Sequence, residues 1–487
     1  MTPVTAAAAT ESPRARLGWG AAMTLAAGLL GGGASLGPVW DADLGWMLAA
    51  GRAMAAGEGV PRVNGWSVAA WSGHPWVMHE WGYARLEWAL FSQLGYGALG
   101  LLRVAALALT VSGVWSMLRA LAAREAAAIT AVVLLGVMGR FESVRPIGMT
   151  LGLGAWVAAL AFAPSLSRLG ALGLGLFGLV WSWAHGSYPL AWAITLAAAI
   201  EIPDDRGRRL GALAAMALGS SLGPYGLALH GLVSRYLYGR GDDATAVVAA
   251  RIVEWWPLWR APLRVMDPTA LTVGLGALAL ALLALARWPR RPRVWLSLAL
   301  AALALWHARN LVVAVTVGLP LLAAGWRGGG ALRPQREALA MGVCLMLGLG
   351  ALTLVARRGA VAVDPSPMPA AALRLTAMTG GAGVFVTLPF AGWALYHGRR
   401  VYWDSRNDCY PGRVVSIALD LDEGRLGPDA ARAALDEAGV RWALVRCDGR
   451  GRQSLAGWAL AGRDAGLCLF RAPPYPSSVL RALPTGR

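Results

Sequence analysis

The sequence is dominated by apolar runs that are separated by short arginine-rich segments. An α-helix needs about 20 apolar residues to cross the hydrocarbon core of a bilayer untilted, and the longer runs reach this length. Only 15% of the 487 residues are charged, whereas soluble domains average about 25%. The pattern predicts an α-helical polytopic membrane protein with about eleven transmembrane helices. The apolar runs occupy residues 17–39, 97–118, 126–139, 148–163, 169–184, 187–201, 210–223, 269–286, 294–306, 309–325 and 338–356.

The basic residues between these runs predict the topology. All 44 are arginine, and with 27 acidic residues they give a net charge of +17. If the N-terminus is cytoplasmic, the arginine-rich loops fall on the cytoplasmic side, as the positive-inside rule requires. The segments 40–96, 140–147, 224–268 and everything after 357 then fall outside. The positive charge is therefore explained by a lipid bilayer as the partner, and no nucleic acid is expected.

The last part of the chain changes character. The short β-like runs GVFVTLPF, RRVYWDSR, VRWALVRC and GLCLFRA alternate with a helical pattern in GPDAARAALDEAG. We therefore predict a transmembrane domain over residues 1–356 and a small extracytoplasmic α/β domain over residues 357–487. Cys409, Cys447 and Cys468 lack the C-x-x-C spacing of a zinc site. An oxidising compartment would allow one disulfide among them, with one cysteine left free.

The first outside loop, residues 40–96, carries two segments with the spacing of amphipathic helices. They read DLGWMLAAGRAMAAG and HEWGYARLEWALFSQLG, and their tryptophans suit helices at the membrane interface. Asp41 and Asp43 follow the first apolar run directly. An aspartate at such a place can simply cap a helix. A carboxylate held against an apolar wall gains basicity by desolvation, however, and this suits a general base, so Asp41 is the first catalytic candidate and Asp43 the second.

A histidine and a glutamate open the second of these segments. His79 and Glu80 are adjacent, and they would face the same pocket as Asp41, with Glu80 as a catalytic carboxylate and His79 as a substrate-binding group. The alternative for Glu80 is an acidic residue that the helix dipole favours. Two acids and a histidine could also hold a divalent cation, but no spacing rule requires one. The metal is therefore left open, and no other cofactor is indicated.

Four further ionisable residues stand at the outer ends of predicted spans: Arg145, His185, His307 and Arg309. Ionisable groups at membrane depth are costly and are usually functional, so we predict that these four bind substrate. Arg145 and Arg309 are the candidates for holding a phosphate, because a guanidinium matches phosphate oxygens with two hydrogen bonds. The alternative is that the arginines only extend to the membrane interface. Glu254, which stands beside two tryptophans, belongs either to an anchor at the interface or to a sugar-stacking surface, and anchoring is favoured.

The motifs of the first outside loop also carry a family resemblance. The stretches DADLGWMLAAGRAMAAGEGVPRVNGWS and GHPWVMHEWGYARLEWALFSQLGYGALGLLR resemble the first outside loop of GT-C class membrane glycosyltransferases, in particular a bacterial group without assigned substrates. The chain is also distantly similar to lipid-linked aminoarabinose and protein mannosyl transferases. The pieces VRPIG, WAHGSYP, LGPYG, IVEWWP, HARN and VYWDSRNDCY follow in the same order. Two positions depart from the group: Met47 stands in place of a histidine, and Asn64 in place of an aspartate.

The resemblance implies an enzyme of the bacterial cytoplasmic membrane. Such a glycosyltransferase moves a sugar from a polyprenyl-phosphate-linked donor to a glycan, lipid or protein acceptor at the extracytoplasmic face, with inversion at the sugar carbon. An acid of the first outside loop acts as the base, and this role corresponds to Asp41, with Asp43 as the second choice. A base at the membrane boundary is what a lipid-tethered donor requires.

Two other functions stay open. A transporter would use arginines and histidines at the ends of spans, but acids in the middle of the predicted spans are nearly absent, which argues against ion coupling. An inactive relative that acts as an assembly partner is the other alternative, and it rests on the changes at Met47 and Asn64.

Overall fold

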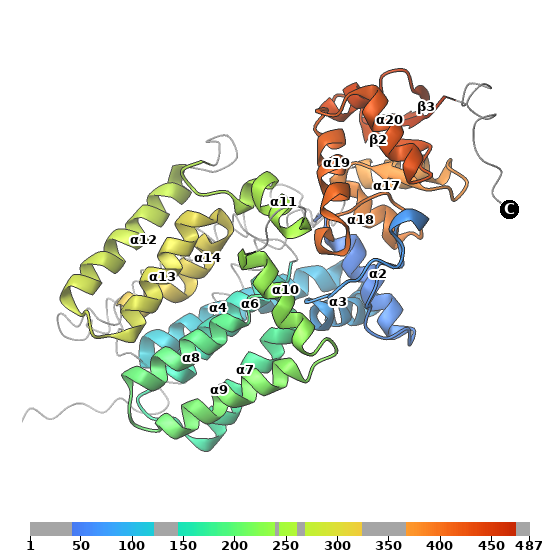
Figure 1. Cartoon of the computed structure of the whole chain (residues 1–487). Coiled ribbons are helices and arrows are strands. Elements are labelled where there is room, and N and C mark those ends of the chain that lie inside the picture. The colour runs from blue at the N-terminus through green and yellow to red at the C-terminus, as the bar shows by residue number, and fades with distance from the viewer. Residues whose placement is uncertain (1–40, 121–144, 239–242, 261–267, 324–366, 474–487) are drawn as a thin grey trace, which may run out of the picture.

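The structure is a computed structural model of the whole chain, and two regions can be told apart in it. Figure 1 shows a group of long helices on one side and a mixed helix and strand region on the other, with α2 and α3 between them. The structure describes residues 41–120, 145–238, 243–260, 268–323 and 367–473. Several predicted features lie outside these ranges, so the number of transmembrane helices stays a prediction. These features are the spans at 17–39, 126–139 and 338–356.

Every predicted apolar run that falls within the described ranges forms helix. Four of these helices begin with a proline, where the missing N–H and the fixed φ are an advantage; they are α6 (Pro146–Ala161), α8 (Pro189–Glu201), α12 (Pro268–Arg287) and α13 (Pro292–Trp306). The other helices of this region are α4 (Gly97–Ala120), α7 (Arg168–Ala184), α9 (Arg206–Ser221), α10 (Leu227–Tyr238), α11 (Ala244–Arg251), α14 (Leu311–Val313) and α15 (Leu319–Ala323). A π-helical stretch, Ala314–Gly318, joins the last two.

Glycines bring neighbouring helices close together, as is common in membrane helix bundles. A Cβ atom on Gly113 of α4 would lie 2.8 Å from the Cβ of Ala155 of α6. A Cβ on Gly152 of α6 would lie 2.7 Å from the Leu109 side chain of α4. Larger residues at Gly113 or Gly152 would therefore push α4 and α6 apart.

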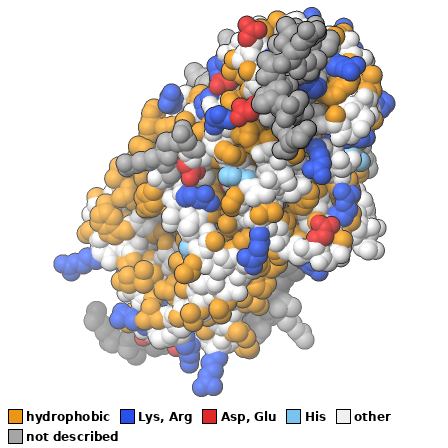
Figure 2. Space-filling model, turned by 45° about the vertical axis from the view of Figure 1, so that its right-hand side comes forward, with side chains coloured by type: hydrophobic (Ala, Val, Ile, Leu, Met, Phe, Trp, Pro, Cys, Tyr) orange, Lys and Arg blue, Asp and Glu red, His pale blue; other side chains and the backbone are white. Residues whose placement is uncertain are grey.

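The surface of the helical region is unusually apolar. Leu169 and Leu172 of α7 are 80% and 68% exposed, and Leu227 at the start of α10 is 76% exposed. Figure 2 shows apolar side chains over much of the visible face, with several arginines at its lower end. Among the described residues, Gly97–Leu118 is the one stretch long and apolar enough to span a membrane by length and composition, and the other apolar helices have 10 to 17 residues.

Helix α2 (Leu44–Ala55) differs from the half-exposed helix that its sequence suggested. Its residues from Leu44 to Gly51 are all buried, as are Ala53 and Met54. The cause is that α2 is enclosed by α3 (Trp81–Leu94) and α18 (Leu388–Tyr396). A Cβ on Gly45 would lie 2.2 Å from the carbonyl oxygen of Gly392, so α2 and α18 touch backbone to backbone. In α3 only Tyr83, Ala84 and Glu87 are buried.

Residues after Pro367 form a four-stranded sheet with helices. The strands lie in the order β1-β2-β4-β3, with β1 and β2 parallel and the other pairs antiparallel. A disulfide links Cys447 to Cys468, and Cys409 is buried with a free thiol. The strands are β1 (Val384–Val386), β2 (Trp442–Arg446), β3 (Ala459–Asp464) and β4 (Leu467–Arg471), and the helices are α17 (Pro367–Ala377), α18, α19 (Gly412–Asp422) and α20 (Pro428–Glu437).

An ion pair connects this mixed region to the helical one. Arg251, at the end of α11, donates to Asp420 of α19 over 2.7 Å. Figure 1 shows α11 and α19 facing each other beside the place where α2 and α3 meet the helical region. The first outside loop, the helical region and the mixed region therefore come together at one place.

Candidate functional site

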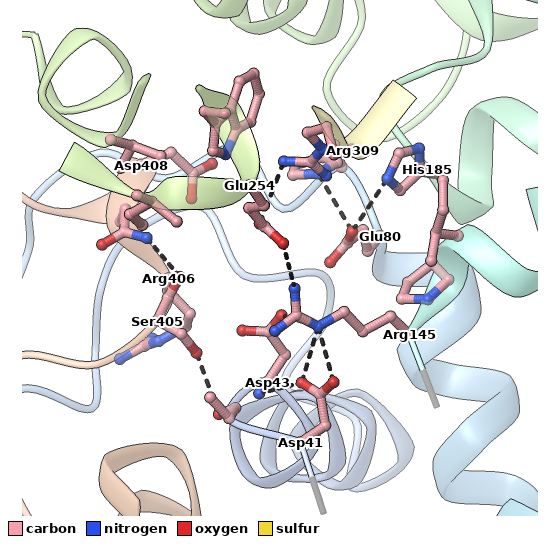
Figure 3. A pocket seen from close by; sticks show the side chains of 18 of the residues that line it. Asp41, Asp43, Glu80, Arg145, His185, Glu254, Arg309, Ser405, Arg406 and Asp408 are labelled. Atoms are coloured by element: carbon pink, nitrogen blue, oxygen red, sulfur yellow. Dashed lines mark hydrogen bonds and ion pairs between the residues drawn. The ribbon is translucent and has the colours of Figure 1, made fainter. Parts of the chain in front are cut away.

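A pocket of about 780 Å³ lies at this meeting place. Its walls come from the starts of α2, α3 and α6, the residue after α7, the segment after α11, the turn before α14, and the segment 405–408 of the mixed region. Most of the site residues predicted from the sequence line this pocket, although they are far apart in the chain (Figure 3). They are Asp41, Asp43, His79, Glu80, Arg145, His185 and Arg309.

Asp41 is the most enclosed carboxylate of the group that surrounds Arg145, with its side chain only 7% exposed. Its Oδ1 accepts the backbone N–H of Asp43 at 2.9 Å, a turn that holds the carboxylate just before α2. The Arg145 Nε donates to both Asp41 oxygens, at 3.0 and 2.8 Å. Burial raises the pKa of Asp41 to about 6, although Arg145 counteracts part of the rise. Asp41 is therefore ionised at neutral pH and is more basic than an ordinary aspartate.

Arg145 is surrounded by three carboxylates. Besides Asp41, its Nε lies 3.1 Å from the Asp43 Oδ2, and its Nη1 lies 3.6 Å from the Glu254 Oε2. Figure 3 shows the guanidinium between the two aspartates and Glu254. Asp43 is the strongest of the influences that raise the pKa of Arg145, so the guanidinium stays charged despite its burial.

Glu254 links Arg145 to the second arginine of the pocket. Its Oε1 lies 3.7 Å from the Nη1 of Arg309. The Arg309 guanidinium also lies 4.2 Å from the centre of the Trp255 ring, and Trp255 stacks on Tyr236 with ring centres 5.4 Å apart. The interpretation of Glu254 as an interface anchor misses this role, because a glutamate beside tryptophans looks the same in sequence whether it faces lipid or a pocket.

A histidine and glutamate group forms another wall. The His79 Nε2 lies 3.4 Å from the Glu80 Oε1, and the His185 Nε2 lies 3.9 Å from the same oxygen. Burial acts to lower the pKa of His79, but Glu80 outweighs it and the net pKa is raised. Burial lowers the pKa of His185 well below its usual value, so this imidazole is neutral. The two histidines therefore differ in their affinity for a proton, although both lie close to the Glu80 carboxylate.

His307 is the predicted substrate-binding residue that the structure leaves outside the pocket lining. Its Nδ1 donates to the carbonyl oxygen of Trp255 at 2.5 Å, and its ring packs edge-on against the Trp255 ring. The structure therefore does not place His307 in the pocket lining, and its role in substrate binding stays a prediction. The histidine instead holds the backbone that presents Glu254 and Trp255, because the chain turns between α13 and α14 next to that segment.

The segment 404–408 contributes pocket residues that the sequence did not single out. Arg406 pairs with Asp404 at 2.7 Å, and neither side chain is exposed at all. The Ser405 hydroxyl donates to the carbonyl oxygen of Ala42 at 3.1 Å and accepts the Trp46 indole N–H at 3.1 Å. The mixed region thus holds the backbone between the two aspartates. The motif VYWDSRNDCY was the sequence signal that marked this segment, but a motif does not show which other segment of the chain it contacts.

The two departures from the family pattern lie away from the pocket lining. Met47 is 1% exposed and belongs to the apolar core. Asn64 is fully buried; its Oδ1 accepts the Ser67 hydroxyl at 3.0 Å, and its Nδ2 donates to the carbonyl oxygen of Cys409 at 3.4 Å. The changes at Met47 and Asn64 therefore remove no group from the pocket.

In the part of the chain that the structure describes, no cluster of three or more His, Cys, Asp or Glu side chains is arranged to hold a metal ion. The cation that lies among Asp41, Asp43 and Glu254 is the Arg145 guanidinium. A divalent cation in this protein therefore stays a prediction.

Comparison with known proteins gives the fold. No protein-family model and no curated protein matches the chain. The oligosaccharyltransferase of Archaeoglobus fulgidus superposes with a TM-score of 0.54 at 11% identity, over 88% of this chain and 69% of that one. The archaeal oligosaccharyltransferase AglB from Archaeoglobus fulgidus, solved with an inhibitory peptide and a dolichol-phosphate, superposes with a TM-score of 0.55 at 11% identity, over 88% of this chain and 70% of that one. The chain has the GT-C fold.

The GT-C fold is a helical membrane fold, which agrees with the class predicted from the apolar runs. ArnT of Cupriavidus metallidurans, solved with undecaprenyl phosphate, is also similar, with a TM-score of 0.48 at 13% identity over 95% of this chain and 100% of that one. At identities of this size the comparison shows the fold but not the function.

Proposed function

We propose that this chain is a membrane glycosyltransferase. It moves a sugar from a polyprenyl-phosphate-linked donor to an extracytoplasmic acceptor, with inversion at the sugar carbon. The observation that carries the proposal is the buried, basic carboxylate of Asp41 in a pocket that also holds the cations Arg145 and Arg309. The shared fold adds support, since the archaeal oligosaccharyltransferase of that fold was solved with a dolichol-phosphate.

Asp41 acts as the general base on the acceptor. A base works best when its pKa lies near the working pH, and burial brings the pKa of Asp41 to about 6. Arg145 orients the carboxylate by donating through its Nε to both carboxylate oxygens. Asp43 is the second candidate, and its contact with Arg145 makes it an orienting group as well.

Arg309 and Arg145 hold the donor phosphate. Their guanidinium groups lie on two sides of Glu254, at 3.7 and 3.6 Å, so an anion between them meets both cations. A phosphate brings more negative charge than a carboxylate and accepts paired hydrogen bonds from arginine. Three more side chains line the wall beside the phosphate position: His79, His185 and Glu80. The two histidines bind substrate, and Glu80 is an alternative catalytic carboxylate to Asp41.

The proposed location is the outer face of a bacterial cytoplasmic membrane. The positive-inside pattern puts the first outside loop and the region from 357 on that face. The disulfide between Cys447 and Cys468 supports this side, because disulfides persist in oxidising compartments.

Sugar transfer and transport can be separated in one preparation. The purified chain in proteoliposomes is given undecaprenyl-phosphate-linked sugars together with an envelope extract as acceptor, and the release of undecaprenyl phosphate is measured beside movement of the lipid-linked sugar across the bilayer. Release that depends on the protein and on the acceptor supports the transferase. Movement across the bilayer without release supports a transporter, and neither process, with normal folding, supports an inactive relative.

A further inference from the structure

Asp408 is a carboxylate of the pocket that the mechanism above does not use. It lies on a single 3-10 turn, Asn407–Cys409, in the mixed region. Its Oδ2 is shielded from solvent, and no described residue hydrogen-bonds to it. A buried polar atom without a partner is destabilising, so its presence in a pocket wall calls for an explanation.

The turn that carries Asp408 is held firmly in place. The buried pair of Asp404 and Arg406 precedes it, and the Arg406 guanidinium lies 5.1 Å from the ring centres of both Trp66 and Trp76. The Asn407 amide nitrogen donates to the carbonyl oxygen of Ser405 at 3.1 Å. The backbone that carries Asp408 is therefore held in place at the pocket wall, so its carboxylate cannot easily move to a hydrogen-bond donor elsewhere.

The surroundings of Asp408 are polar and aromatic. Figure 3 shows its carboxylate on the opposite side of the pocket from His185, with Glu254 between them. Burial raises the pKa of Asp408, whereas nearby His79 acts to lower it; the ion-pair partner of His79 is Glu80, 3.4 Å away. The stacked rings of Tyr236 and Trp255 line the same cavity. A ligand group placed here would meet an acceptor oxygen, an imidazole donor and a flat apolar face.

We propose that Asp408 recognises the transferred sugar by accepting a hydrogen bond from one of its hydroxyl groups. This inference rests on the function proposed above and adds a specificity residue to it. A sugar combines hydroxyl donors with C–H faces that pack on aromatic rings, and the pocket offers both partners. A site that buries an unpaired acceptor also discriminates against ligands that lack the matching donor. Asp408 is then the contribution of the mixed region to donor selection.

The test compares a bare lipid phosphate with the same lipid carrying a sugar. The probes are undecaprenyl phosphate and undecaprenyl phosphate linked to glucose, mannose or arabinose, bound to the full chain in nanodiscs. We expect the wild-type chain to bind at least one sugar-linked probe more tightly than the bare lipid. Asp408→Ala should reduce that preference about tenfold and leave the affinity for the bare lipid unchanged. Asp408→Asn, which keeps one acceptor oxygen, should lose less.

The matched control is Asp429→Ala, an exposed aspartate of α20. A full sugar preference in Asp408→Ala would overturn the inference, and so would a wild-type chain that prefers none of the sugar-linked probes. Equal weakening of all probes by Asp408→Ala would also overturn it, since that result means a structural role. If the wild-type chain binds neither the bare nor the sugar-linked lipid, the proposed function itself fails.

Discussion

Replacing Glu254 by glutamine should increase the affinity of the chain for a lipid phosphate. The Glu254 carboxylate lies between Arg145 and Arg309, at 3.6 and 3.7 Å, in the position that we assign to the donor phosphate. A phosphate must therefore displace this carboxylate before it meets both arginines. Glutamine keeps the size of the side chain and removes the competing charge.

The size of the effect follows from the exposure of the groups. The Glu254 side chain is 42% exposed and the two arginines are 33% and 29% exposed, so solvent screens both ion pairs. Screened pairs of this kind contribute about 0.2–1 kcal/mol each. Two such pairs correspond to a gain of roughly 2- to 30-fold in affinity. The geometry should survive, because Arg145 keeps Asp41 and Asp43, and Arg309 keeps the Trp255 ring.

The assay is a titration of the chain in nanodiscs with undecaprenyl phosphate, followed by tryptophan fluorescence at low and high salt. The expected gain is largest at low salt and shrinks as salt screens the charges. The control is Glu58→Gln, an exposed acid of the first outside loop that does not line the pocket. An affinity of Glu254→Gln equal to or lower than that of the wild-type chain would refute the argument that Glu254 occupies the phosphate position.

Other predictions follow from the same pocket. Arg309→Ala should weaken binding of undecaprenyl phosphate about 10- to 100-fold, which is the contribution of a charge-assisted hydrogen bond, and should leave the thermal stability unchanged. An unchanged affinity would mean that Arg309 is an interface residue only. Transfer should need ionised Asp41, whose pKa is raised to about 6, so kcat should fall about tenfold per pH unit below 6; a flat profile down to pH 5 would count against Asp41 as the base. Cys447→Ser removes the disulfide, so it should lower the unfolding midpoint of the mixed region in a non-reducing buffer, with a loss of stability of about 2–4 kcal/mol. Adding a reductant to the wild-type chain should lower its midpoint by the same amount.

The membrane class could be predicted from the sequence, and seven of the eight predicted site residues line the pocket. Apolar runs report a membrane protein directly, because the bilayer demands them whatever the packing. Arg145, His185 and Arg309 were found for a related reason, since an ionisable residue at the end of a span is rare unless it has a function.

Other parts of the site depend on contacts that no local pattern records. Asp408 and Ser405 enter the pocket only because the mixed region packs on α2, and the small residues that allow this contact, Gly45 and Gly392, are far apart in sequence. His307 lies outside the pocket lining because its ring bonds to the backbone of Trp255, a contact that its place at the end of a span does not reveal. The burial of α2 was missed since its amphipathic spacing gives no information on the second surface that covers it.

The most direct test of the account is transfer by Asp41→Asn. The substitution keeps the shape of the side chain and removes the base, while Arg145 can still donate to the amide oxygen. Release of undecaprenyl phosphate from a sugar-linked donor is measured for the wild-type chain, for Asp41→Asn and for the exposed control Asp429→Asn. The account predicts that Asp41→Asn loses about 10²–10⁴-fold in rate with donor affinity nearly unchanged. Full activity of Asp41→Asn, with activity lost instead in Asp43→Asn or Glu80→Gln, would contradict the assignment of Asp41 as the base.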